Sequence, residues 1–290
     1  MKTALVLGSG GPAAIAWETG AITGLADEGV DVRHADLVIG TSGGAVVGAQ
    51  IRSASAIDEL FSLLADPARQ PVEAAPRIDF TQWREEVLLL KQQDSNPTAV
   101  LRHLGAMALR VSPDAEAERR DQIAARLSLR VWPTDHLGIV AVDVESGERC
   151  VFDRASGVDL IDAATASGAV PGVWPVVEML GRRYMDGGTY SLDNADLAKG
   201  CDDVLVLTIP ARMPPLCMVS LQEAVDLLER GGAHVRIVVP DDRTRAAFAT
   251  VKGNLLDPAV RTPAAFAGRE QGRRVSGAFD RSSPWRQKRP

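Results

Sequence analysis

The feature that most constrains this chain is a serine flanked by small residues, set between an apolar run and a helix-like stretch. The segment G-T-S-G-G at residues 40–44 follows a strand-like run at residues 36–39 and opens a helical stretch at residues 43–56. A serine on a tight strand-to-helix turn has a strained backbone, and its neighbours must be small for the chain to pass. The segment therefore predicts a strand, a sharp turn and a helix, with the Ser42 hydroxyl lifted out of the sheet.

Short apolar runs alternate with helical patterns along most of the chain, which predicts an α/β domain with a mostly parallel sheet. Besides the run before Ser42, strands are expected at residues 3–7, 137–144, 149–152, 183–185, 204–209 and 235–239. Helices are expected at residues 13–28, 43–56, 159–166 and 221–230. This pattern indicates a three-layer α/β/α sandwich around a mostly parallel central sheet.

A block at about residues 66–134 differs because it contains helical patterns and no convincing strand. Apolar residues recur at helical spacing in residues 80–93 and again in residues 100–111. A third helix is expected to begin at Ser112-Pro113, an N-cap followed by proline. Such a helical insert can shape a substrate cleft or simply complete the core, and the sequence leaves both roles open.

Composition fits one globular domain, which we assign to residues 1–268. The 290 residues are 46% hydrophobic and 24% charged, close to the averages of soluble proteins. The first apolar run breaks at Gly8 and soon meets Glu18, so it predicts a buried strand rather than a signal peptide. Three cysteines without metal-ligand spacing fit buried thiols in a cytoplasmic protein, namely Cys150, Cys201 and Cys217.

Charge is unevenly spread. Residues 269–290 hold seven basic and two acidic residues, a net charge of +5. Because the whole chain has a net charge of −6, residues 1–268 carry −11. An acidic body disfavours nucleic acid as a partner. We expect residues 269–290 to be a basic, poorly ordered tail that could make transient contact with an anionic membrane surface.

A second glycine cluster, G-S-G-G-P at residues 8–12, follows the first expected strand. Exposed N–H groups in such a loop can bind a phosphate or the oxyanion of an acyl-transfer intermediate. The dinucleotide fingerprint also needs an acidic residue at the end of the next strand, where this chain has Gly40 and Thr41. Both loops lie at carboxyl ends of strands, so an oxyanion hole beside Ser42, shared with the N–H of Gly43, is the more economical role.

A serine nucleophile needs a base. His234 is the only histidine late enough for a Ser…Asp…His order, yet it precedes its strand, whereas catalytic groups in α/β sheets project from carboxyl ends. Asp186, followed by Gly187 and Gly188, comes directly after a strand and is better placed, although a D-G hairpin turn is the ordinary alternative. The pKa of a free aspartate, about 3.9, suits a base only when burial raises it.

Together these motifs resemble the patatin-like phospholipase family: a glycine-rich first loop, G-T-S-G-G, and a late D-G-G. Residues 167–175, S-G-A-V-P-G-V-W-P, are similar to its S-x-A-x-P-x-x-F-x-P segment, and the match spans residues 3–210. The resemblance implies hydrolysis of fatty-acyl esters, including phospholipids, by a Ser–Asp dyad without histidine, metal or other cofactor. By matching position, Ser42 would be the nucleophile and Asp186 the base. Oxyanion donors would be Gly8, Ser9, Gly10, Gly11 and Gly43, with supporting glycines Gly40, Gly44, Gly187 and Gly188.

The chain departs from that family in its first loop. Many members have G-G-G-x-R/K-G, whose basic residue is thought to support the oxyanion loop, whereas residues 10–14 here are G-G-P-A-A. Pro12 also has no N–H to offer. Three hypotheses therefore stand: a serine acyl hydrolase using Ser42 and Asp186, a His234-dependent α/β-hydrolase, and a catalytically silent lipid- or protein-binding module.

Overall fold

One sheet forms the middle layer of the protein. The computed structural model describes residues 1–53, 55–71, 76, 80–93, 96–210 and 218–286. Within them the strand order is β5-β6-β3-β2-β1-β7-β8, with β4 paired to β3. The strands are β1 (Thr3–Leu7), β2 (Leu37–Thr41), β3 (Leu137–Asp143), β4 (Arg149–Phe152), β5 (Val177–Met179), β6 (Arg182–Asp186), β7 (Asp203–Leu207) and β8 (His234–Val238). The run from β3 to β8 is parallel, and β4, β5 and β6 are antiparallel to their neighbours.

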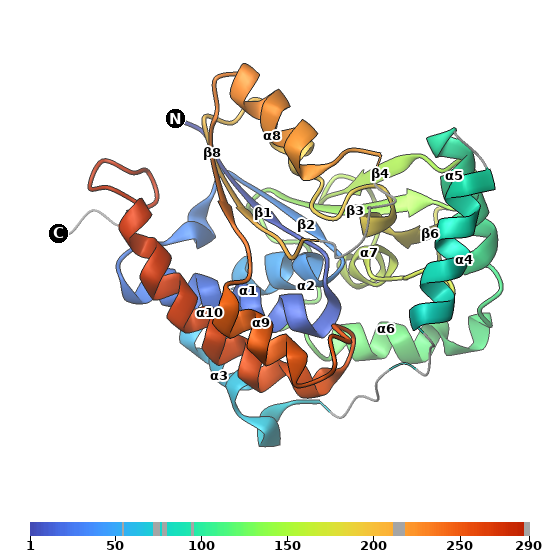
Figure 1. Ribbon diagram of the computed structural model, residues 1–290, viewed down its shortest axis with the longest axis horizontal. Helices are drawn as coiled ribbons and strands as arrows, with labels where there is room; N and C mark the ends of the chain where they lie inside the picture. Colours follow the sequence, from blue (N-terminus) through green and yellow to red (C-terminus); the bar gives the residue numbers. More distant parts are fainter. Residues whose placement is uncertain (54, 72–75, 77–79, 94–95, 211–217, 287–290) are drawn as a thin grey trace.

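Helices cover both faces of this sheet (Figure 1), which confirms the α/β fold. All of β1 is buried, with Leu5 and Leu7 in one core cluster and Ala4 and Val6 in the other. A strand buried on both faces reads as a continuous apolar run, as residues 3–7 do. The first cluster includes residues of α1 (Gly11–Asp27), α2 (Gly43–Ile51), α3 (Ile57–Ala65), α6 (Glu116–Ala124), α7 (Leu160–Ser167), α9 (Asp242–Ala249) and α10 (Arg261–Val275). The opposite face is covered by α8 (Leu221–Arg230) and by α4 (Phe80–Gln93) and α5 (Pro97–Ala108).

The helical insert forms as the periodicity predicts. The third helix begins as a 3₁₀ turn, Pro113–Ala115, capped by the Ser112 side chain, and continues as α6. Apolar side chains of α4 and α5 pack against Val142 and Met185 of the sheet. Two of the insert's helices therefore complete the core over β3 and β6.

The C-terminal segment corrects the expectation of a poorly ordered tail. Helix α10 runs across residue 269, and beyond it Phe279 and Trp285 are buried. The cause is a close crossing of α10 and α1 at glycines of both helices. A Cβ on Gly24 would lie 2.0 Å from the Arg269 carbonyl oxygen, and one on Gly272 would lie 2.1 Å from that of Ala21. The basic charge of residues 269–290 favoured the prediction of a poorly ordered tail, and the glycines that allow α1 and α10 to cross closely were not recognised as a packing signal.

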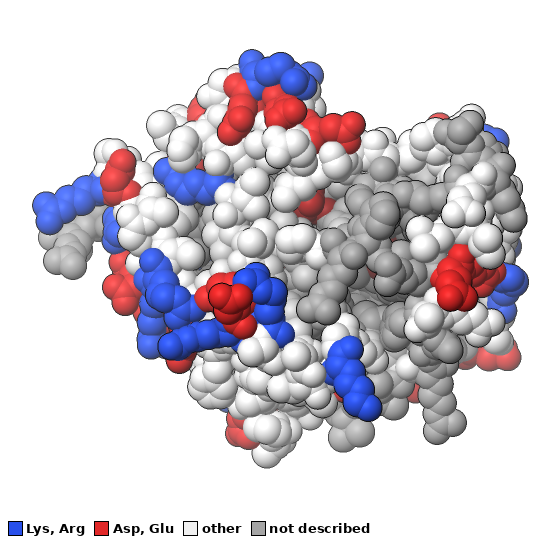
Figure 2. All heavy atoms as spheres, viewed as in Figure 1, with Lys and Arg blue, Asp and Glu red and all other residues white. Residues whose placement is uncertain are grey.

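The arginines of this segment are paired with carboxylates. Arg269 and Arg273 both donate to Asp27, and Arg274 forms an ion pair with Asp241. Figure 2 shows the resulting mixture of blue and red side chains over α9 and α10. Arg269, Arg273 and Arg274 therefore do not by themselves create a surface of a single sign.

Smaller differences concern short or polar elements. Helices α3 and α9 and strand β5 were not expected from the sequence, and α2 ends at Ile51 rather than near residue 56. Cys201 is buried and Cys150 half-buried, whereas Cys217 lies outside the described residues. No described helix is long and apolar enough to cross a lipid bilayer.

Candidate active site

Ser42 occupies a strained turn between β2 and α2. Its φ of 55° and ψ of −114° lie outside the regions that non-glycine residues ordinarily adopt. Although Ser42 is the N-cap of α2, its hydroxyl makes no capping hydrogen bond. Gly44 must lack a side chain because a Cβ there would lie 2.2 Å from the Leu7 carbonyl oxygen. The predicted strand–turn–helix is confirmed, and it leaves the hydroxyl available for another partner.

That partner is the carboxyl group of Asp186, the last residue of β6. The Ser42 hydroxyl donates a hydrogen bond to it, and the N–H of Gly188 donates to Oδ1 at 2.6 Å. Asp186 is 5% exposed, and this burial raises its pKa to about 7, against the hydrogen bonds and the positive charge of Arg119, which lower it. A group with such a pKa can act as a general base near neutral pH. The structure thus brings together the two loops that the sequence singled out.

The last residue of α7, together with the residues that follow it, holds the backbone of both Ser42 and Asp186 in place. The Ser167 hydroxyl accepts the N–H of Ser42 at 2.8 Å and donates to the Val140 carbonyl at 2.6 Å. Two residues later, the Ala169 carbonyl accepts the N–H of Asp186 at 3.0 Å. The S-x-A part of the family-like segment therefore fixes the backbone of Ser42 and of Asp186 relative to β3.

Asn194 is a supporting residue that the sequence analysis missed. It is fully buried and left-handed, with a φ of 53°, a conformation that asparagine tolerates better than most residues. Its side-chain amide donates to the Thr41 hydroxyl at 3.1 Å and to the Ser191 carbonyl at 2.8 Å. Asn194 therefore links the residue before Ser42 to the loop that follows Asp186. Its position after a D-G-G and a short loop was the available signal.

The glycine loop after β1 offers fewer donors than expected. The N–H of Gly8 donates to the Leu207 carbonyl at 3.0 Å and to Glu18 Oε1 at 2.9 Å, and the N–H of Ser9 donates to the Leu192 carbonyl at 2.7 Å. These two N–H groups are occupied because the chain still pairs with its neighbours as it leaves β1. Gly8 and Ser9 are thus unsuited to the donor role that the resemblance implied.

The remaining expected donors are better placed. Among the described residues, no hydrogen-bond acceptor faces the N–H of Gly10, Gly11 or Gly43. Gly11 packs directly against Gly43, since a Cβ on Gly43 would lie 3.1 Å from the Gly11 nitrogen. Gly10 and Gly11 have φ angles of 150° and 54°, which turn the loop towards α1. Of these groups, the N–H of Gly43 follows Ser42 directly at the N-terminus of α2, where the helix dipole adds positive potential.

The helical insert contacts the segment that follows Ser167. Trp83 Nε1 of α4 donates to the Pro171 carbonyl at 2.8 Å, and the guanidinium of Arg119 from α6 lies 4.0 Å from the centre of the Trp174 ring. Both contacts fall on the segment that continues from Ser167. The insert therefore also contributes to the surroundings of the site, in addition to completing the core.

His234 lies elsewhere. It is the first residue of β8, at the amino end of the sheet, with its side chain 62% exposed and 3.8 Å from Asp203. Ser42 follows the carboxyl end of β2, and β1 runs parallel to both β2 and β7. The structure therefore separates His234 from Ser42 by the length of the strands.

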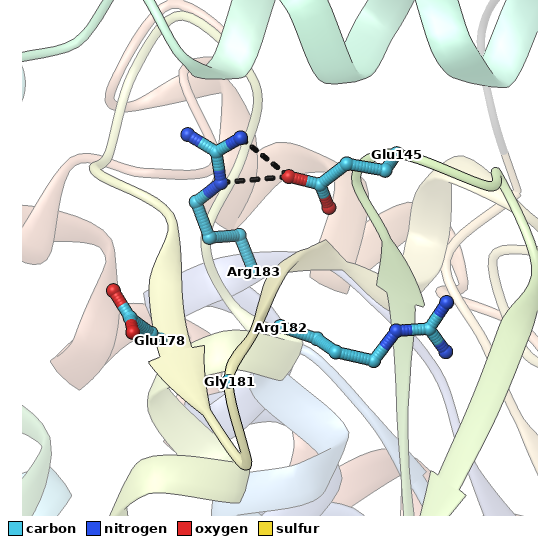
Figure 3. A pocket seen from close by; sticks show the side chains of 5 residues that line it. All are labelled: Glu145, Glu178, Gly181, Arg182 and Arg183. Atoms are coloured by element: carbon cyan, nitrogen blue, oxygen red, sulfur yellow. Dashed lines mark hydrogen bonds and ion pairs between the residues drawn. The ribbon is translucent and has the colours of Figure 1, made fainter.

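A hollow of about 470 Å³ beside the β5–β6 hairpin is distinct from this site. Figure 3 shows Arg183 turned towards Glu145, to which its Nε donates at 2.7 Å, while Arg182 points away from it. Arg182 forms an ion pair with Asp143. The hollow lies at the amino end of β6, opposite Asp186, and its arginines already have carboxylate partners.

A strained serine that is hydrogen-bonded to a buried carboxyl group, beside open N–H groups at the carboxyl edge of an α/β sheet, has the parts that nucleophilic catalysis by serine requires. Residues 5–199 match the family model of the patatin-like phospholipases, and the chain belongs to this family. The resemblance seen in the motifs is thereby confirmed. Membership of this family supports a lipid-hydrolase function.

Comparisons with individual proteins give more distant similarities. No curated protein sequence matches the chain. The crystal structure of VipD from Legionella pneumophila is 12% identical with a TM-score of 0.46, over 96% of this chain and 67% of VipD. The type III effector ExoU is 18% identical with a TM-score of 0.43, over 96% of this chain and 53% of ExoU. The chain thus spans about half the length of ExoU.

Proposed function

We propose that the protein is a serine acyl hydrolase that cleaves fatty-acyl esters of lipids through Ser42 and Asp186. The observation that carries this proposal is the hydrogen bond from the Ser42 hydroxyl to a buried carboxyl group with a pKa of about 7. Family membership supports the lipid substrate. The separation of His234 from Ser42 supports a two-residue mechanism without histidine.

The reaction follows from the positions of these groups. Ionised Asp186 accepts the hydroxyl proton as Ser42 Oγ attacks the acyl carbonyl carbon. The resulting oxyanion accepts hydrogen bonds from the N–H groups of Gly10, Gly11 and Gly43. Collapse breaks the ester bond, and the departing alkoxide takes the proton from Asp186. Asp186 then deprotonates a water molecule that attacks the acyl-Ser42 ester, which releases the fatty acid and returns the proton to Ser42.

Labelling with a fluorophosphonate tests this proposal because the reagent phosphonylates an activated serine. We expect peptide mapping to place the label on Ser42, with no label in Ser42→Ala. Ser62→Ala is a matched control, since Ser62 lies on α3 and its hydroxyl donates to the Asp58 carbonyl. Native protein that stays unlabelled while binding liposomes would overturn the proposal and favour the silent lipid-binding module.

A further inference from the structure

Glu18 is a buried acid that the proposed reaction does not use. It lies in α1 with 0% exposure, and burial raises the pKa of its carboxyl group well above the ordinary value, which favours the neutral acid. Its Oε1 accepts the N–H of Gly8 at 2.9 Å. Its Oε2 has no hydrogen-bond partner among the described residues. A buried carboxyl group with one unsatisfied oxygen is costly, so its presence calls for a specific role.

The peptide groups of Gly8 connect Glu18 to both loops of the site. The Gly8 N–H is shared between Glu18 and the Leu207 carbonyl, and the Gly8 carbonyl accepts the N–H of Gly44 at 3.1 Å. Gly44 belongs to the first turn of α2, directly after Ser42 and Gly43. Glu18 therefore holds the residue at which the glycine loop leaves β1 and at which that loop contacts the nucleophile turn.

Satisfying a backbone donor does not account for Glu18. The Gly8 N–H already has an acceptor in the Leu207 carbonyl at 3.0 Å, as expected for a chain that extends the β1–β7 pairing. An apolar residue at position 18 would leave no backbone donor unpaired and would avoid burying an acid. What an apolar residue could not do is pull the Gly8 peptide towards α1.

We propose that Glu18 is a positioning residue for the reaction, which holds residues 8–11 where the N–H groups of Gly10 and Gly11 reach the oxyanion on Ser42. This inference rests on the proposed function. Glu18 acts from behind the loop, through Gly8, and touches neither the substrate nor Ser42. Small displacements of such donors cost rate rather than substrate affinity, because the donors act on the transition state.

Three substitutions test the proposal. Glu18→Met keeps the side-chain length and removes the acceptor, so we expect both the rate constant of fluorophosphonate labelling and kcat for a p-nitrophenyl ester to fall about 10- to 100-fold, with KM changed less than about threefold. Glu18→Gln keeps an acceptor oxygen and should restore both rates to within about threefold of native. Thr19→Val is the matched control, since the Thr19 hydroxyl is equally buried and has no partner among the described residues.

The outcomes separate this inference from the proposed function. Native protein that is not labelled at all would refute the proposed function itself. Native labelling with an equally fast Glu18→Met variant would refute only the role of Glu18, as would a Glu18→Gln variant as slow as Glu18→Met. If Glu18→Met does not fold, Glu18→Asp carries the test. It keeps the acid but withdraws its oxygens by about 1.5 Å, and the same loss of labelling rate is expected.

Discussion

The loops after β1 and β2 are both glycine-rich and both lie at the carboxyl edge of the sheet, yet they are determined in different ways. The conformation of the Ser42 turn is encoded in its own residue types: the φ of 55° at Ser42 and the close approach of Gly44 to Leu7 both depend on the pattern G-x-S-x-G. The glycine loop depends on distant residues, because Leu192, Leu207 and Glu18 decide which of its N–H groups stay open. The residue types of a loop therefore predict its backbone strain better than they predict which of its N–H groups remain without a hydrogen-bond acceptor.

Removing the hydroxyl of Ser42, the proposed nucleophile, should give the largest effect. Ser42→Ala should lower p-nitrophenyl-ester hydrolysis by about 10³-fold or more, because no other group in the turn can form the acyl-enzyme. The free energy of unfolding should change by less than about 1 kcal/mol, since the hydroxyl does not cap α2. Thermal unfolding and ester hydrolysis measure the two quantities. Retained turnover in this variant would end the assignment of the Ser42 turn as the reactive loop.

Removing the carboxyl group of Asp186, the proposed base, should give the next largest effect and reveal the titration of this group. Asp186→Asn should reduce the rate by about 10²–10⁴-fold. In the native enzyme the rate should rise with pH through about 7, because the base acts only when ionised and its pKa lies there. A pH–rate profile of kcat/KM checks this. A midpoint near the ordinary aspartate value of about 4 would show that the carboxyl group is not buried in solution.

The raised pKa of Asp186 also makes stability depend on pH: stability should fall with rising pH, whereas the reaction rate should increase. The unfolded chain ionises Asp186 at its ordinary pKa, so the native state loses stability as pH rises from about 4 to about 7 and keeps that loss at higher pH. Asp186→Asn removes this titration. Urea unfolding should therefore show the variant gaining stability relative to native between pH 4 and 7. An unchanged difference across this range would contradict the proposed burial.

Adding a single methyl group to each of the two loops should lower the free energy of unfolding by different amounts. Gly44→Ala drives its Cβ against a backbone oxygen 2.2 Å away, and we expect a loss of about 3 kcal/mol. A Cβ on Gly8 would lie 2.9 Å from the Thr208 hydroxyl, which can rotate, and 3.2 Å from backbone atoms of Leu207 and Thr208, so Gly8→Ala should lose less, about 1 kcal/mol. Gly277→Ala, with no atom within 4 Å of its Cβ, is the control. Equal losses at Gly8 and Gly44 would remove the distinction between the loops.

The smallest effect is expected at His234. Its side chain is exposed at the far end of β8, so His234→Ala should leave ester hydrolysis within about twofold of native. A steep loss of kcat would instead restore the histidine-dependent hypothesis. Steady-state kinetics on the same p-nitrophenyl ester used for Ser42→Ala decides between them.

The sequence predicted the strands, helices and turns that continuous apolar runs and glycine-rich segments encode. The bounds of β1 and α4, and the meeting of Ser42 with Asp186, follow from such patterns. The polar helix α9 and the three-residue strand β5 carry too weak a periodicity to be recognised. The roles of Ser167 and Asn194 could not be predicted because each depends on hydrogen bonds to residues remote in sequence.

The packing of α10 on α1 also affects the order in which the fold is completed during synthesis. Trp17 of α1 donates a hydrogen bond to Gln271 of α10, 254 positions later, and α1 begins with the glycine loop of the candidate site. A nascent chain that has already emerged from the ribosome with Ser42 and Asp186 still leaves one side of α1 uncovered. The helix that follows the glycine loop therefore gains its final packing partner only after α10 has been translated, late in synthesis.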